Sequence, residues 1–187
     1  MAAVPAHSQL IDGVAPLVAS LRNRGLKIGS TTGYNRDIMR VLAPLCAAQG
    51  FSPDNLVCAG DVPENRPAPL GMYRCFLELG VWPAPRVLKV DDTVPGLMEG
   101  RHAGCWTVAV LASGNEVGLM AQEWRELPDA QKCARRDLAQ RRLAAAQADY
   151  CVDTVAELPQ AIEAIERRLG AGDRPGGAAP PLRPKAA

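Results

Sequence analysis

The chain has 187 residues, enough for one domain with a sizeable hydrophobic core. Its 21 Lys and Arg residues are balanced by 20 Asp and Glu residues, and the net charge of +1 excludes a strong field that would attract nucleic acid or an anionic membrane. A small-molecule substrate is therefore expected. The amino terminus lacks a signal-peptide pattern, and no apolar run approaches the roughly 18 residues of a membrane span, so the sequence predicts a cytoplasmic protein.

The cysteines and tryptophans are interpreted as packing residues. The cysteines form no CxxC pair, and only two histidines accompany them, which argues against a zinc site and predicts reduced, mostly buried thiols. The six cysteines are Cys46, Cys58, Cys75, Cys105, Cys133 and Cys151, of which the second, third and fourth are expected in the core. The tryptophans expected to pack are Trp82, Trp106 and Trp124.

Hydrophobic periodicity predicts alternating helices and strands along the chain. An apolar stripe at helical spacing predicts a first helix over 11–24, with Gly25 as its stop. Short apolar runs, each followed by a polar loop and another helical pattern, come next. Strands are expected over 26–31, 56–59, 86–90, 105–111 and 148–152, and further helices over 36–49, 70–79, 94–103 and 155–169.

This alternation predicts an α/β fold with a doubly wound, Rossmann-like parallel sheet, because right-handed crossovers place helices on both faces. In such sheets the ligand crevice lies at the carboxyl ends of the strands, so loops 30–36, 60–67 and 91–96 should face one site. The predicted domain covers 11–169, after a short amino-terminal stub over 1–10. Residues 170–187 are rich in Gly, Pro and Ala and are expected to be a disordered tail.

Two of these loops carry candidate anion-binding groups. Ser30, Thr31, Thr32 and Gly33 follow a strand, so their hydroxyls and backbone amides could converge on a phosphate-like oxyanion, although hydroxyl residues also serve simply as helix caps. Arg66 lies on a proline-rich loop that could present its guanidinium to a phosphoryl group, or it is a solvated loop arginine.

The third loop begins with two adjacent carboxylates. Asp91 and Asp92 directly follow an apolar run and repel one another unless a cation lies nearby, and Mg²⁺ is a cation that carboxylate and phosphate oxygens hold. The alternative is that Asp92 or Thr93 only caps the helix that begins near Val94. Lys89 lies inside the strand and is assigned no catalytic role.

The amino-acid sequences of these segments resemble those of phosphonoacetaldehyde hydrolases (phosphonatases) of the haloacid dehalogenase superfamily. The similarity covers roughly residues 11–169 and includes four motifs. They are GSTTGYNRDIM at 29–39, DVPENRPAP at 61–69, LKVDDTVPGLMEGRHAGCWTVAV at 88–110 and SGNEVGL at 113–119.

This resemblance implies a role for individual residues. Thr32 and Gly33 match the phosphate-binding end of the second superfamily motif, and Arg66 matches the basic residue of the third. Asp92 matches a carboxylate that holds Mg²⁺, the implied cofactor. Gly96 stands where many superfamily members have a further aspartate, so Asp91 is a candidate for that metal-side role.

The sequence departs from the family because two of its characteristic segments are not found. The family's DxAGT-like nucleophile motif and its helical cap, which supplies an imine-forming lysine, are not found, and Lys27 matches only an ordinary strand lysine. The superfamily places the strand of the nucleophile between the strand ending at Thr31 and the strand ending at Val90. We therefore expect a partial core domain, neither active nor securely folded alone.

The resemblance implies that the complete enzyme cleaves phosphonoacetaldehyde to acetaldehyde and phosphate, with a small-molecule phosphonate substrate and a homodimeric assembly. Two alternatives remain open at this point. One is a generic phosphatase of the same superfamily without imine chemistry. The other is a non-catalytic remnant or partner-binding domain.

Overall fold

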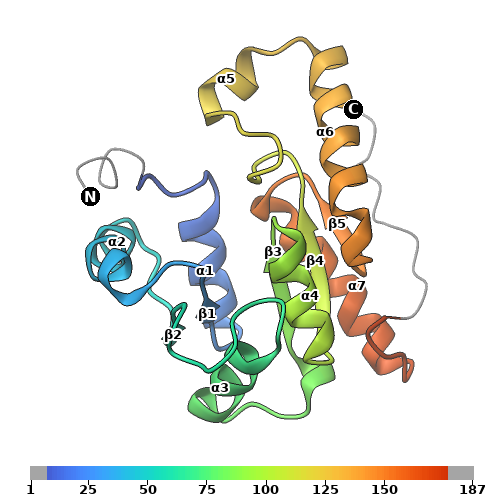
Figure 1. Ribbon diagram of the computed structural model, residues 1–187. Coiled ribbons are helices and arrows are strands. Elements are labelled where there is room, and N and C mark those ends of the chain that lie inside the picture. The colour runs from blue at the N-terminus through green and yellow to red at the C-terminus, as the bar shows by residue number, and fades with distance from the viewer. Residues whose placement is uncertain (1–7, 177–187) are drawn as a thin grey trace.

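The computed structural model describes residues 8–176, which form a layered α/β structure (Figure 1). The strands are short, and the helices that follow them return the chain to the same edge each time. The strands are β1 Gly29–Thr31, β2 Asn55–Val57, β3 Leu88–Asp91, β4 Trp106–Val110 and β5 Tyr150–Val152. The helices are α1 Val14–Asn23, α2 Arg36–Ala48, α3 Leu70–Leu79, α4 Val94–His102, α5 Ala121–Glu126, α6 Asp129–Leu143 and α7 Leu158–Gly170, with short 3₁₀ helices η2 Ala84–Arg86, η3 Ala144–Ala146 and η4 Val155–Glu157.

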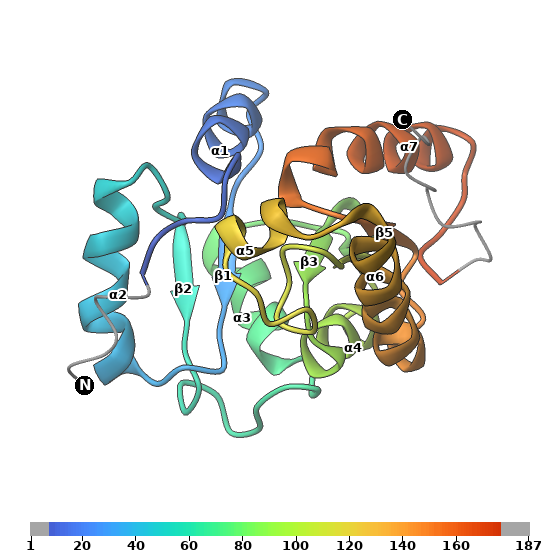
Figure 2. The same ribbon diagram turned by 90° about the horizontal axis from the view of Figure 1, so that it is seen from above.

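The strands form two parallel sheets, one of order β2-β1 and one of order β3-β4-β5. In the described part of the chain, β1 and β3 do not pair, although side chains connect them and Figure 2 shows the two sheets side by side. The register places Thr31 opposite Val57 in one sheet and Asp91 opposite Ala109 in the other. The expected parallel α/β fold is thus confirmed, but its sheet is divided between β1 and β3.

Strand β4 is the centre of the hydrophobic core, with all five of its residues buried. Because side chains alternate across a strand, Trp106 and Val108 pack against α7 while Ala109 packs with Leu97 of α4 and Leu143 of α6 on the opposite face. Burial on both faces explains why β4 is apolar apart from Thr107, whose hydroxyl is satisfied by Asp149. A third cluster joins α3 to the residues between α4 and β4, and the segment that follows α3 packs against it.

Most element positions match the sequence expectations, with identifiable differences. Gly25 follows α1 at a φ of 76°, a conformation that suits glycine at the end of a helix. Arg86 lies in η2 and not in a strand, and Asp91 is the last residue of β3 and not a loop residue. Helices α5 and α6 were not predicted, because α6 is rich in Arg, Asp and Gln and carries only a sparse apolar stripe.

The packing predictions for Trp and Cys were right only in part. Trp106 is buried and Trp124 packs against the α4–α6 cluster, but Trp82 is 78% exposed, so its assignment as a packing residue was wrong. All six cysteines are free thiols within the described residues, yet only three of them are buried and Cys133 is exposed. The prediction that most of the cysteines are buried was therefore wrong, because half of them are not.

The ends of the chain are described only in part. Of the expected tail, Gly170 still belongs to α7, Asp173 pairs with Arg168, and the Gly176 amide donates to Asp149 Oδ1 at 2.8 Å. Residues 177–187, like residues 1–7 of the expected stub, lie outside the described residues. None of the helices in the described range 8–176 is both long enough and apolar enough to cross a bilayer.

Candidate active site

The loop after β1 is held in place by its own backbone and by the start of α2. Thr32 N donates to Val57 O at 2.9 Å, which continues the pairing of β1 with β2 by one residue. The Thr32 hydroxyl accepts from Tyr34 N, and Asn35 caps α2 by accepting from Ile38 N. Thr32 and Gly33 are therefore fixed at the carboxyl end of β1, as the motif predicts.

Hydrogen bonds made by its side chains fix the loop that carries Arg66. Asn65 Oδ1 accepts from Gly60 N, and Asp61 accepts from Cys58 N and from the Arg36 guanidinium. Burial favours the neutral acid of Asp61, but the amide and guanidinium donors outweigh burial and hold the pKa of this carboxyl below its usual value. Burial, aided by the Asp61 carboxylate, raises the pKa of the Cys58 thiol, so this thiol stays protonated.

These two loops and the start of α4 enclose a cavity of about 430 Å³. Its lining includes Thr32, Gly33, Arg66, Cys58, Thr93 and Glu99. A Cβ atom placed on Gly33 would lie 3.5 Å from Arg66 Nη2, so the guanidinium lies directly beside the Thr32–Gly33 backbone. The cavity thus combines a cation, a hydroxyl and a glycine amide, which are groups that bind oxyanions.

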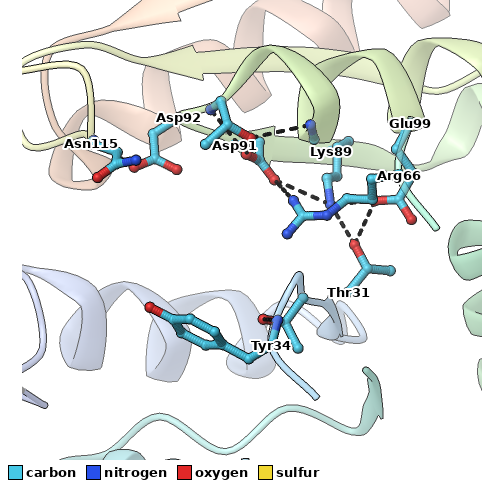
Figure 3. A network of polar contacts seen from close by, with 11 residues as sticks. Thr31, Tyr34, Arg66, Lys89, Asp91, Asp92, Glu99 and Asn115 are labelled. Atoms are coloured by element: carbon cyan, nitrogen blue, oxygen red, sulfur yellow. Dashed lines mark hydrogen bonds and ion pairs between the residues drawn. The ribbon is translucent and has the colours of Figure 1, made fainter. Parts of the chain in front are cut away.

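Asp91, at the end of β3, binds the arginine that lines this cavity (Figure 3). Asp91 Oδ2 lies 2.8 Å from Arg66 Nη1 and 3.4 Å from Lys89 Nζ. Its other oxygen, Oδ1, accepts from Thr93 N at 3.0 Å and from Thr93 Oγ1 at 2.8 Å. The carboxylate is therefore a nearly buried anion, and its side chain is only 10% exposed.

A second group of polar side chains bridges the gap between the two sheets. Lys89 Nζ on β3 lies 2.9 Å from Glu99 Oε2 on α4 and 2.5 Å from Thr31 Oγ1 on β1. The Thr31 hydroxyl donates to Glu99 Oε2 at 2.7 Å. Lys89 and Glu99 are both buried, so each charge depends on the other for compensation. Side chains, and not backbone hydrogen bonds, thus connect β1 to β3.

Three glycines provide the space for these charged side chains. A Cβ at Gly71 would lie 2.5 Å from Glu99 Oε1, and a Cβ at Gly100 would lie 2.4 Å from Lys89 Cβ. A Cβ at Gly96 would lie only 2.1 to 2.2 Å from the carboxylate carbon and both oxygens of Asp91. Any side chain at these glycines would therefore displace the charged groups.

Asp92 points away from its neighbour. Its Oδ2 accepts from Asn115 N at 2.7 Å, and Figure 3 shows the Asp91 and Asp92 side chains diverging. Asp92 does not line the cavity, and no group of three His, Cys, Asp or Glu side chains suited to a metal occurs between residues 8 and 176. Mg²⁺ usually takes only one or two protein carboxylates, with water and phosphate as its other ligands, so Asp92 fits as one such ligand.

The structure thus brings together part of the expected site. Thr32, Gly33 and Arg66 line one cavity, while Asp92 lies at the same end of the sheet with its carboxylate directed elsewhere. The phosphate and metal roles of these residues remain predictions. The sequence interpretation missed the pairing of Lys89 with Glu99. The available signal was weak: a lysine inside an apolar strand, and a glutamate in a helical segment that is otherwise mostly apolar or glycine.

Comparison with known proteins defines the class. A family model described as haloacid dehalogenase-like hydrolase matches residues 1–104, and the chain belongs to this family. Within it, the chain is similar to phosphonoacetaldehyde hydrolases: it is 45% identical to that of Paraburkholderia phytofirmans over 94% of this chain and 66% of the relative. The identity to the one from Hahella chejuensis is 47%, over 88% of this chain and 56% of the relative.

The solved structures agree with this assignment. A phosphonoacetaldehyde hydrolase-like protein from Oleispira antarctica superposes with a TM-score of 0.89 at 40% identity, covering 92% of this chain and 62% of that one. A phosphatase of the same superfamily from Thermococcus onnurineus, at 19% identity and a TM-score of 0.58, shares the fold alone. The chain spans about two thirds or less of the length of these phosphonoacetaldehyde hydrolase relatives.

Proposed function

We propose that this chain is the phosphate-binding and metal-binding core of a phosphonoacetaldehyde hydrolase, which cleaves phosphonoacetaldehyde to acetaldehyde and phosphate. The observation that carries the proposal is the cavity in which Thr32, Gly33 and Arg66 meet, although they come from two separate loops. Its support from relatives is the 45% identity to a phosphonoacetaldehyde hydrolase over 94% of the chain.

In this proposal each residue acts on the phosphoryl group of the substrate. Arg66 binds a phosphoryl oxygen, and the Thr32 hydroxyl and Gly33 amide donate to others, so that charge developing on phosphorus meets fixed donors. Asp92 holds Mg²⁺ as one carboxylate ligand, and Asp91, the other candidate, would have to exchange a contact with Arg66 or Thr93 for the cation. The bound cation would neutralise phosphoryl charge and ease the approach of an anionic nucleophile.

The nucleophilic aspartate and the imine-forming lysine are proposed to come from a segment outside these 187 residues. Two observations support this. No DxAGT-like motif occurs in the sequence, and the chain spans only 66% of the length of a relative that it otherwise matches closely. In addition, β1 and β3 do not pair with each other within residues 8–176, so their facing edges could accept one more parallel strand.

In the completed enzyme, which we propose to be a cytoplasmic homodimer, the lysine condenses with the aldehyde and releases water. The electron pair of the carbon–phosphorus bond then moves into the imine to give an enamine, while the aspartate takes the phosphoryl group. Water cleaves the acyl phosphate to phosphate, and protonation and hydrolysis of the enamine release acetaldehyde. Residues of this chain hold the phosphoryl group throughout.

The test is to express residues 1–187 alone and together with the amino-terminal segment of a relative, and to measure acetaldehyde release with Mg²⁺. We expect turnover only for the combination, and Arg66→Gln in the combination should abolish most of it. Borohydride in the presence of substrate should trap a covalent adduct on the lysine. Phosphate release without trapping would favour a phosphatase without imine chemistry, and robust turnover by the isolated chain would refute the division of labour proposed here.

A further inference from the structure

The anion closest to Arg66 belongs to the protein itself. Asp91 Oδ2 lies 2.8 Å from Arg66 Nη1, and the same carboxylate receives Thr93 N and the Thr93 hydroxyl. A guanidinium, a backbone amide at the start of a helix and a hydroxyl are the donors that an external oxyanion would use. The Asp91 carboxylate therefore occupies an anion site made by donors from two loops.

This placement depends on Gly96. A Cβ on residue 96 would lie 2.1 Å from the Asp91 carboxylate carbon, so the carboxylate fits only because that residue has no side chain. The aspartate is also held firmly, because its side chain is 10% exposed and both of its oxygens have donors. It is thus a built feature of the site and not a surface carboxylate that meets an arginine by chance.

The charges around this position already balance. Two cations, Arg66 and Lys89, face two carboxylates, Asp91 and Glu99, at distances of 2.8 to 3.4 Å. An oxyanion in the cavity that reaches Arg66 Nη2 would share the guanidinium with Asp91 and would lie close to a like charge. Asp91 therefore opposes the binding of the very group that Arg66 is placed to bind.

We propose that Asp91 is a resident anion of the Arg66 site that sets the affinity of the cavity for tetrahedral oxyanions such as phosphate or a phosphonate group. This inference rests on the proposed phosphate-binding role of Arg66. Asp91 acts through Arg66, whose guanidinium it holds and partly neutralises, so it is a positioning residue that weakens binding without touching the ligand itself. Loss of its charge frees Arg66 for the ligand.

The experiment measures the dissociation constant for inorganic phosphate on the full chain, from the amide NMR signals of Thr32 and Gly33. Asp91→Asn keeps the shape of the side chain and removes its charge, and Asp91→Gly removes the side chain entirely. The matched control is Asp129→Asn on α6, which makes the same charge change at a side chain that is 99% exposed. Folding of each variant is checked by circular dichroism.

We expect at least a tenfold lower dissociation constant for phosphate in the Asp91 variants and no change in the control. A decrease smaller than tenfold in both Asp91 variants would overturn the resident-anion proposal. Arg66→Gln added to Asp91→Asn separates the two proposals, because it should abolish the gain in affinity. If phosphate binding to Asp91→Asn does not depend on Arg66, the phosphate role of Arg66 is itself wrong, and with it the proposed site.

Discussion

Gly96→Ala should destabilise the protein, although the same change in most helices is stabilising. Gly96 lies in the first turn of α4, where replacing glycine by alanine ordinarily stabilises by up to about 1 kcal/mol. Here the new methyl group would lie 2.1 to 2.2 Å from three atoms of the Asp91 carboxylate, far inside contact distance. The carboxylate must leave, and it loses its bonds to Arg66 and Thr93. With hydrogen bonds to charged groups contributing ~1.5–3 kcal/mol each, we expect a net loss of about 2–4 kcal/mol.

The measurement is urea unfolding of the full chain, followed by circular dichroism at constant pH and salt concentration. Gly170→Ala is the matched control, because Gly170 lies at the end of α7 with no atom within 4 Å of its would-be Cβ, and it should change the stability by no more than about 1 kcal/mol. In the Asp91→Gly background, Gly96→Ala should cause no further loss, because the carboxylate that the methyl group would displace is already gone. If Gly96→Ala is neutral or stabilising in the wild-type chain, the Asp91 carboxylate does not occupy this space.

Three further predictions concern other parts of the molecule. Asp92→Asn in the completed enzyme should weaken Mg²⁺ binding, because it removes an anionic oxygen from a hard-cation site, and calorimetry showing unchanged metal affinity would contradict the metal role. Lys89→Met should cost about 3–5 kcal/mol in urea unfolding because it leaves Glu99 buried without its cation, whereas Lys89→Met with Glu99→Leu should restore much of that loss. Burial raises the pKa of Cys105 to about 12, so its thiol stays protonated at pH 8 and should resist iodoacetamide until the protein unfolds. The exposed Cys133 should react first, and mass spectrometry showing early modification of Cys105 would refute this.

Local features were predictable from the sequence because short-range physics determines them. Helical spacing located α2, α3 and α4, and the alternative that Thr93 caps a helix is confirmed, since its hydroxyl accepts from Gly96 N. The motif order also predicted that the Thr32 and Arg66 loops meet, because parallel strands bring their carboxyl ends to one edge.

Side-chain direction and long-range pairing were not predictable in the same way. Asp91 and Asp92 are neighbours in sequence, yet consecutive residues at the end of a strand project to opposite sides, so one binds Arg66 and the other meets Asn115. The sequence alone could not show which of the two would bind Arg66. Nor could it show that Lys89 reaches Glu99 and Thr31, because the first contact depends on the packing of α4 on β3 and the second on the distance between the two sheets.

The bridge between the sheets also bears on how the chain behaves among other unfolded or partly folded chains. Strands with open hydrogen-bonding edges, such as β1 and β3, tend to capture a strand from another molecule and start aggregation. Here a strand that enters between β1 and β3 would have to displace Thr31 from Lys89 and Glu99 and leave that buried pair without the hydroxyl. We therefore expect the buried charges to disfavour an apolar strand at this edge and to favour a segment that brings a polar group in place of the Thr31 hydroxyl.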